Sequence, residues 1–123
     1  MTPKKIKELV LKNRELELSE FIELLQSIDD TNDGITVEKY DCAIELNFSG
    51  INTFIHAFVS DEICENEELY KEVVELAENE DWEELEEKII RFYVCVIDEK
   101  GDTITTYEDF FLTREEWLRL GSR

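Results

Sequence analysis

The chain has 123 residues, a hydrophobic fraction of 42% and a formal net charge of −19, with 32 acidic and 13 basic residues. This length and apolar content predict a single folded domain, residues 1–123, and exclude wholesale disorder. The strong negative charge repels phosphate groups, so it argues against direct binding to DNA, RNA or an anionic membrane and favours a partner with a basic surface.

The N-terminal part predicts two helical segments. Thr2 and Pro3 are a typical helix start, with a capping hydroxyl before a proline at the first helical position. Two apolar stripes follow that are out of phase, which predicts a break near residues 13–18, with Ser19 as the cap of the second segment. We expect the polar stretch 29–34 to end that segment.

Three strands are predicted in the middle of the chain and a fourth near its end. Residues 41–48 alternate between apolar and polar, which indicates a half-buried strand. Residues 53–60 also fit a helix, because apolar residues recur there at helical spacing, but we prefer a second strand that completes a hairpin. The apolar run 91–98 predicts the central strand, and "DEKGD" around Gly101 predicts a turn into a strand over 103–107.

The remaining elements are predicted as helices. Residues 66–78 carry one apolar face, and a second helix begins at Asp81, where Glu84 lies at the capping-box position. Thr113 and Glu116 predict the start of a short last helix. The order of elements predicts an α+β fold, in which an N-terminal helical segment, an acidic helix pair and a short C-terminal helix pack on a small antiparallel sheet of about four strands.

No pattern in the chain supports catalysis or metal binding. The stretch "DDTNDGITVEKY" (29–40) matches the first half of a calcium-binding EF-hand loop, with Gly34 at the sixth position. Its twelfth position is Tyr40, where a bidentate glutamate is needed. The single histidine, His56, and the cysteines lack the close spacing of zinc sites, and no nucleophile motif accompanies them. We therefore predict no catalytic residue, no metal and no cofactor.

The three cysteines, Cys42, Cys64 and Cys95, bear on the compartment. An odd number without paired spacing is typical of reduced cysteines in a reducing compartment. The N-terminus lacks the apolar segment of a signal peptide, and no stretch approaches the roughly 20 apolar residues of a membrane span. We expect a cytoplasmic protein.

The acidic residues concentrate in one region. From Asp61 to Glu87 the chain has fourteen acidic residues and one basic residue, Lys71. The apolar faces of the two helices leave the carboxylates pointing outward, where like charges at i+3 and i+4 cost about 0.2–0.5 kcal/mol per pair. The candidate binding residues, here called the acidic belt, are Glu67, Glu68, Glu72, Glu75, Glu78, Glu80, Asp81, Glu83, Glu84, Glu86 and Glu87.

Two interpretations of the acidic belt stay open at this point. It can be a solvated face that aids solubility, although such faces usually mix both signs of charge. It can also mimic a polyanion, because carboxylates on adjacent helices present a charge array comparable to the phosphates of DNA and can occlude a groove of lysine and arginine. The first fourteen residues are instead basic, which leaves three roles open for them: pairing with the belt in the same chain, contact with RNA, or oligomerisation.

The chain combines a short α+β domain, a strong negative charge, the glutamate-rich stretch "ENEELYKEVVELAENEDWEELEEK" and no catalytic motif. In these features it resembles the small phage- and plasmid-encoded inhibitors of bacterial defence, the anti-CRISPR and antirestriction DNA mimics. The resemblance implies a non-enzymatic inhibitor in the bacterial cytoplasm. Its acidic belt would block the DNA- or PAM-binding groove of a CRISPR effector or restriction enzyme.

Two alternatives to this function remain. One is an immunity protein that neutralises a basic nuclease toxin, since such proteins are also small and acidic. The other is an acidic interaction module that binds its partner through the apolar face of the N-terminal helical segment, including Phe21 and Leu25. The module predicts that substitutions at Phe21 or Leu25 abolish function, whereas mimicry predicts that charge reversal in the belt does so.

Overall fold

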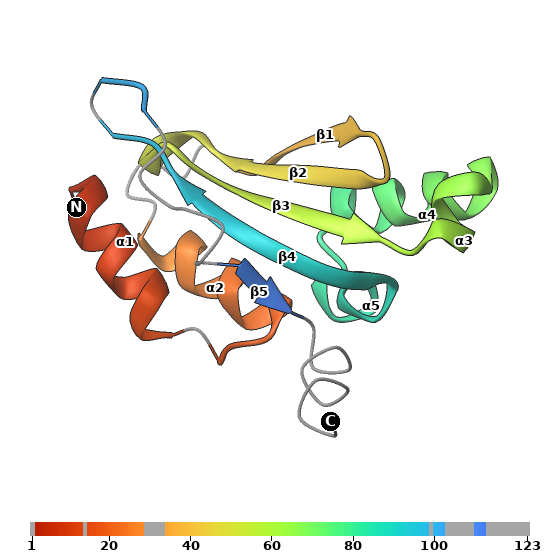
Figure 1. The fold of residues 1–123 in the computed structure, drawn as a ribbon, viewed down its shortest axis with the longest axis horizontal. Coiled ribbons are helices and arrows are strands. Elements are labelled where there is room, and N and C mark those ends of the chain that lie inside the picture. Colours follow the sequence, from red (N-terminus) through yellow and green to blue (C-terminus); the bar gives the residue numbers. More distant parts are fainter. Residues whose placement is uncertain (1, 14, 29–33, 99, 103–109, 113–123) are drawn as a thin grey trace.

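The computed structural model describes residues 2–13, 15–28, 34–98, 100–102 and 110–112. Five strands form one antiparallel sheet in the order β1-β2-β3-β4-β5, with helices packed on it, which confirms the predicted α+β fold (Figure 1). The helices are α1 (Pro3–Lys12), α2 (Leu18–Ile28), α3 (Asp61–Glu65), α4 (Glu67–Glu78) and α5 (Trp82–Lys88), with a 3₁₀ turn η1 (Ser49–Ile51). The strands are β1 (Thr36–Tyr40), β2 (Ala43–Phe48), β3 (Thr53–Val59), β4 (Ile89–Val96) and β5 (Phe110–Leu112).

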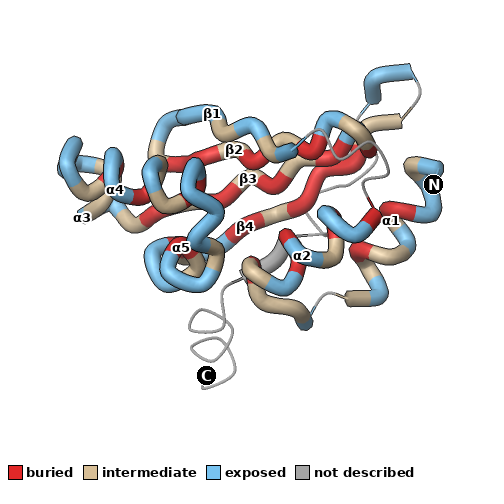
Figure 2. Tube along the Cα trace, turned by 180° about the vertical axis from the view of Figure 1, so that it is seen from behind, coloured by how far each residue is buried: buried red, intermediate tan, exposed pale blue. Residues whose placement is uncertain are grey.

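One face of the sheet and the helices enclose the hydrophobic core. The strand register places Leu46 beside Ile55 and Ile55 beside Val94, and all three side chains are fully buried. The helices cover this face, with α1 and α2 toward one end and α4 and α5 toward the other (Figures 1 and 2). The acidic helices therefore lie at one end of an elongated sheet.

The N-terminal helix begins and ends as its sequence predicts. The Thr2 hydroxyl accepts a hydrogen bond from the Lys5 N–H at 3.3 Å, and Pro3 is the first helical residue. The chain leaves the helix at Asn13, whose side-chain amide donates to the Leu9 carbonyl at 2.8 Å. The predicted break near residues 13–18 is confirmed.

The ambiguous segment 53–60 is a strand. In β3, alternate residues from Thr53 to Val59 face the core, while Phe54, His56 and Phe58 lie on the opposite face. Apolar residues on both faces produce the spacing that also fitted a helix, and pairing with β2 and β4 decides in favour of the strand.

Among the helices and strands of the described residues, β1, α3 and β5 were not predicted, and β1 and α3 lack a local signal. Most side chains of the edge strand β1 are exposed, so the alternation that reveals a strand is absent. The five residues of α3 include no fully buried side chain and are too few to show a helical period. β1 is held by its pairing with β2, and α3 by its contacts with α4.

The turn predicted at Gly101 is present. The Asp98 carboxylate accepts hydrogen bonds from the N–H groups of Lys100 and Asp102, both at 2.9 Å, and Gly101 has a φ of 88°. The strand predicted over 103–107 and the last helix predicted from Thr113 fall outside the described residues, whereas β5 pairs with β4 where no strand was predicted.

The cysteine prediction was wrong for two of the three residues. Cys42 and Cys64 form a disulfide with their Cα atoms 4.9 Å apart, whereas Cys95 is a buried thiol. Cys42 precedes β2 and Cys64 follows β3. Because the antiparallel register places the start of β2 beside the end of β3, the two cysteines meet although they are 22 residues apart.

Tyr70 joins α4 to the turn between β1 and β2. Its hydroxyl donates to the backbone carbonyls of Tyr40 and Ala43, which flank that turn. The Tyr70 side chain is 9% exposed, and burial raises the pKa of its phenol above the usual value. This contact fixes one end of α4 against the sheet.

We expect Tyr70→Phe to lower the free energy of unfolding by about 1–2 kcal/mol, because the carbonyl acceptors lose their donor while the aromatic packing is kept. Urea denaturation followed by circular dichroism measures the change. Tyr40→Phe is the matched control, since the Tyr40 side chain is 47% exposed, and it should stay within about 0.5 kcal/mol of the wild type. Equal effects of the two substitutions would contradict the anchoring role of Tyr70.

Candidate binding surface

The helix α4, which carries five of the eleven belt residues, has a defined start. The Asn66 side-chain oxygen accepts hydrogen bonds from the N–H groups of Glu68 at 3.0 Å and Leu69 at 3.2 Å, which caps α4. Tyr70, Val73 and Ala77 then face the core. Because these residues recur at helical spacing, they aim the intervening glutamates at solvent.

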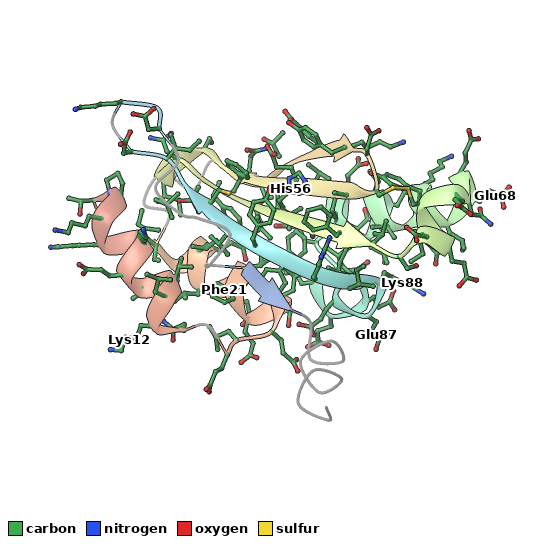
Figure 3. All side chains as sticks on the ribbon, in the orientation of Figure 1. Lys12, Phe21, His56, Glu68, Glu87 and Lys88 are labelled. Carbon is green, nitrogen blue, oxygen red and sulfur yellow. A yellow bond between two sulfur atoms is a disulfide. The ribbon has the colours of Figure 1, made fainter. Side chains whose placement is uncertain are left out.

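The structure places ten of the eleven belt residues at the exposed surface and one, Glu86, at an intermediate depth. Leu85 is the fully buried residue of α5, so the flanking glutamates of that helix point away from the core. Figure 3 shows Glu68 on α4 and Glu87 on α5 at the same end of the molecule. The exposed carboxylates thus come from α4, α5 and the residues that connect these two helices.

Glu86 has a structural role that its sequence context did not predict. Its carboxylate accepts hydrogen bonds from the Ser19 N–H at 3.1 Å and the Ser19 hydroxyl at 3.3 Å. Ser19 lies in the first turn of α2, so Glu86 satisfies a free N–H group there and Ser19 is not the cap that the sequence predicted. Burial raises the pKa of the Glu86 carboxyl, and the Ser19 N–H partly opposes that rise.

The connection between the two acidic helices also carries belt residues. Glu80 has a φ of 59°, and its carboxylate accepts a hydrogen bond from the Gln26 amide at 3.3 Å. Asp81 lies at the N-cap position of α5, but its side chain makes no capping hydrogen bond. The predicted capping box with Glu84 is therefore not formed.

The charge distribution is partly unfavourable for the helices themselves. Glu67 and Glu68 lie in the first turn of α4, where the helix dipole stabilises negative charge. Glu75 and Glu78 lie near its C-terminus, where the dipole opposes them, and the last turn has no basic residue. Within the described ranges, no ion pair joins a belt carboxylate to a lysine or arginine.

The basic N-terminal helix is remote from the belt. Figure 3 shows Lys12 on α1 and Glu68 on α4 at opposite ends of the sheet, and Figure 2 shows the same separation of α1 and α4 from behind. This separation of α1 from α4 argues against pairing of Lys12 with the α4 carboxylates, and Arg14 lies outside the described residues. The molecule instead has its lysine-rich α1 at one end and its carboxylates at the other.

His56 lies in an aromatic cluster on the sheet face opposite the core. Its ring centroid is 5.3 Å from that of Tyr40, 5.0 Å from Phe58 and 5.1 Å from Tyr93. Its Nδ1 lies 3.6 Å from a Glu45 carboxylate oxygen. Burial lowers the pKa of His56 while Glu45 raises it, and the net shift is downward. Packing against these rings is therefore a sufficient structural reason for a histidine at position 56.

The apolar face of α2 does not form a docking surface. Phe21 and Leu25 are each 0% exposed and belong to the core cluster. Substitutions at these positions would destabilise the fold rather than remove a partner contact. Phe21 and Leu25 are therefore not available as partner contacts in this structure, and the interaction module itself stays a prediction.

Metal sites and membrane spans were also sought. Among the residues that the structure describes, no group of three or more His, Cys, Asp or Glu side chains could hold a metal ion; residues 29–33 of the EF-hand-like stretch lie outside them. None of the described helices has the length and apolar character needed to cross a membrane.

Comparisons with protein-family models, with curated proteins and with solved structures found no match.

Substitution of Glu86 tests whether its hydrogen bonds to Ser19 stabilise the fold, unlike the exposed carboxylates of the belt. We expect Glu86→Ala to lower the free energy of unfolding by about 1 kcal/mol, since Ser19 loses its acceptor. Glu86→Gln keeps an acceptor oxygen and should cost less. The exposed Glu87→Ala is the control, with an effect within about 0.5 kcal/mol.

The pH dependence of the Gln variant adds a second measurement. A raised carboxyl pKa means that the folded protein binds the proton more tightly than the unfolded chain, so this contribution to stability is lost as pH rises through the folded pKa. Denaturation from pH 4 upward to neutral pH should therefore show Glu86→Gln gaining stability relative to wild type with rising pH. A constant difference would contradict the burial of this carboxyl.

Proposed function

We propose that this protein is a non-enzymatic inhibitor of a bacterial defence nuclease, a CRISPR effector or restriction enzyme, and that its acidic belt occupies the basic groove in which the nuclease binds nucleic acid. The observation that carries the proposal is the exposure of ten carboxylates on two packed helices and their connection. The bacterial cytoplasm is the compartment in which such a target would be met.

Rigid presentation supports mimicry over a solvated face. The buried side chains of α4 and α5 hold both helices on the sheet, so the carboxylates lose little conformational freedom beyond their own rotamers when a partner binds. Charge of one sign on a fixed surface accelerates encounter with a basic groove and disfavours acidic partners. Inhibition would result from occlusion of the groove and needs no catalytic group.

The proposal depends on the exposed members of the belt. Glu86 is engaged by Ser19 and contributes to the fold, so it is excluded from the contacting set. Glu72, Glu75 and Glu83 are exposed and project from the outer faces of α4 and α5, which makes them suitable for neutralisation. Glu8 on α1, Glu38 on β1 and Asp102 in the turn after β4 are also exposed, and they lie on elements outside the belt.

A charge-matched pair of variants tests the proposal. The belt variant changes Glu72, Glu75 and Glu83 to Gln, and the control variant changes Glu8 and Glu38 to Gln and Asp102 to Asn, which gives both proteins the same net charge. Pull-downs from bacterial lysates with wild type and both variants identify a retained protein, and binding of that purified protein is then measured at two salt concentrations. We expect a nucleic-acid-binding protein that duplex DNA displaces.

The affinity of the belt variant for this partner should fall at least tenfold, a loss of about 1.4 kcal/mol, while the control variant changes little. Added salt should weaken wild-type binding strongly. Equal weakening of both variants would mean that net charge alone governs the interaction. Retention of a partner that DNA does not displace would also contradict mimicry, and a toxin nuclease as that partner would favour the immunity-protein function.

A further inference from the structure

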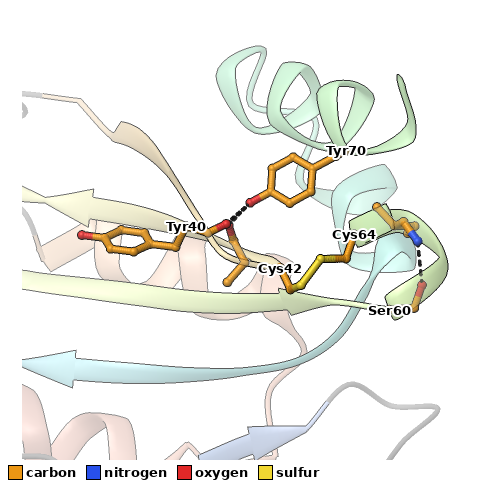
Figure 4. Close-up of a disulfide and its surroundings, with 7 residues drawn as sticks. Tyr40, Cys42, Ser60, Cys64 and Tyr70 are labelled. Atoms are coloured by element: carbon orange, nitrogen blue, oxygen red, sulfur yellow. Dashed lines mark hydrogen bonds between the residues drawn. A yellow bond between two sulfur atoms is a disulfide. The ribbon is translucent and has the colours of Figure 1, made fainter. Parts of the chain in front are cut away.

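The disulfide lies at the end of the sheet that carries α4 (Figure 4). A solvent-open pocket adjoins it. Cys42 and Cys64 both line this pocket, whose volume is about 520 Å³, and both side chains are partly exposed. The volume falls within the range of small-molecule sites. A small reagent in the pocket can therefore reach the sulfur atoms.

The pocket lining carries charges of both signs. Lys39 and Lys71 supply cations, and Asp41 and Glu67 supply carboxylates. The Lys39 ammonium lies 5.2 Å from the centre of the Tyr70 ring, so this cation is placed by a contact with the pocket wall. An amino-acid-derived thiol such as glutathione carries both carboxylate and ammonium groups and fits a lining of this kind.

The backbone at Cys42 also points to a role for its sulfur. Its φ of 59° lies in the left-handed region, which glycine or asparagine adopts more readily than cysteine. Nothing in the local turn requires a cysteine at this position, so the residue serves the bond to Cys64.

The segment tied by the disulfide packs on the core only through partly buried side chains, Ile63 and Cys64. α3 has five residues and no fully buried side chain, and its start is capped by the Ser60 hydroxyl, which accepts from the Ile63 N–H at 3.4 Å (Figure 4). Helices of this length are marginal without tertiary support. On the other side of the bond, Tyr70 holds the β1–β2 turn to α4 independently of the disulfide.

We propose that Cys42 and Cys64 are a redox-active pair that a small amino-acid-derived thiol reduces through this pocket, and that reduction releases α3 while the sheet and the other helices stay folded. Asp61, Glu62 and Glu65 on α3 are exposed and adjoin the belt, so the released segment is itself acidic. The inference does not depend on the identity of any protein partner.

The reaction is a thiol–disulfide exchange in two steps. The thiolate of one small thiol attacks a sulfur atom of the cystine, and the Cys42–Cys64 bond breaks as a mixed disulfide forms; the other cysteine leaves as a thiolate and takes up a proton. A second small thiol then attacks the mixed disulfide, which frees the second cysteine and forms the disulfide of the small thiol. Two electrons pass from the two small thiols to the cystine.

Hydrogen exchange tests the local release. The wild-type protein is incubated without denaturant in oxidised or reduced glutathione, its thiols are counted by alkylation and mass spectrometry, and exchange is measured peptide by peptide. We expect two more reactive thiols in the reduced sample and at least tenfold faster exchange in residues 60–66, with unchanged protection in β4.

Three outcomes would overturn the proposal of a local switch: a bond that is reduced only in denaturant, unchanged exchange in residues 60–66, or loss of protection throughout the sheet. Cys42→Ser/Cys64→Ser should match reduced wild type in both buffers, and Cys95→Ser should respond as wild type does. If the double variant does not fold, reduced wild type provides the same state without substitution.

The entry route has its own test. Lys39→Gln/Lys71→Gln should slow reduction by glutathione at least threefold, because the remaining lining repels its carboxylates, and should leave reduction by neutral 2-mercaptoethanol unchanged. Equal slowing with both thiols, or no slowing with either, would show that the pocket does not select the reductant and would overturn that part of the proposal.

Discussion

The pairing of β2 with β3 is the constraint on which the rest of the structure depends. Its register places Leu46 and Ile55 side by side on the face that the helices cover. A shift by one residue would turn these side chains to the opposite face, since the side-chain period of a strand is two. The same register brings the start of β2 to the end of β3, so it also determines that Cys42 meets Cys64.

The acidic end of the molecule is stable because apolar packing outweighs charge repulsion. Like-charged neighbours on α4 and α5 cost about 0.2–0.5 kcal/mol per pair. Burial of a large apolar side chain such as Val73 or Leu85 contributes about 1.5–3 kcal/mol. A few anchors on the inner faces of these helices therefore hold a surface of one charge sign in a fixed geometry, which is the property that the proposed inhibitor needs.

Neighbouring glutamates on α5 have different roles despite their similar sequence surroundings. Glu86 completes the first turn of α2 through Ser19, whereas Glu87 is exposed to solvent. The same end of the molecule carries the disulfide and the short helix α3. A structural carboxylate, a proposed binding surface and a proposed redox site thus lie at the same end of the molecule, and of the two disulfide cysteines only Cys64 follows β3 in the chain.

Local patterns in the sequence determined the α+β class, the start of α1 at Thr2 and Pro3, and the outward direction of most belt residues, because capping and helical periodicity involve residues within a few positions of one another. Tertiary structure alone decided the role of Glu86, which contacts a residue 67 positions away, and the disulfide, which spans 22 positions. Tertiary structure also decided the existence of β1 and α3, since neither contains enough buried residues to produce a periodic signal. Each of these features depends on which distant segments the sheet brings together, and no local pattern of residues specifies that contact.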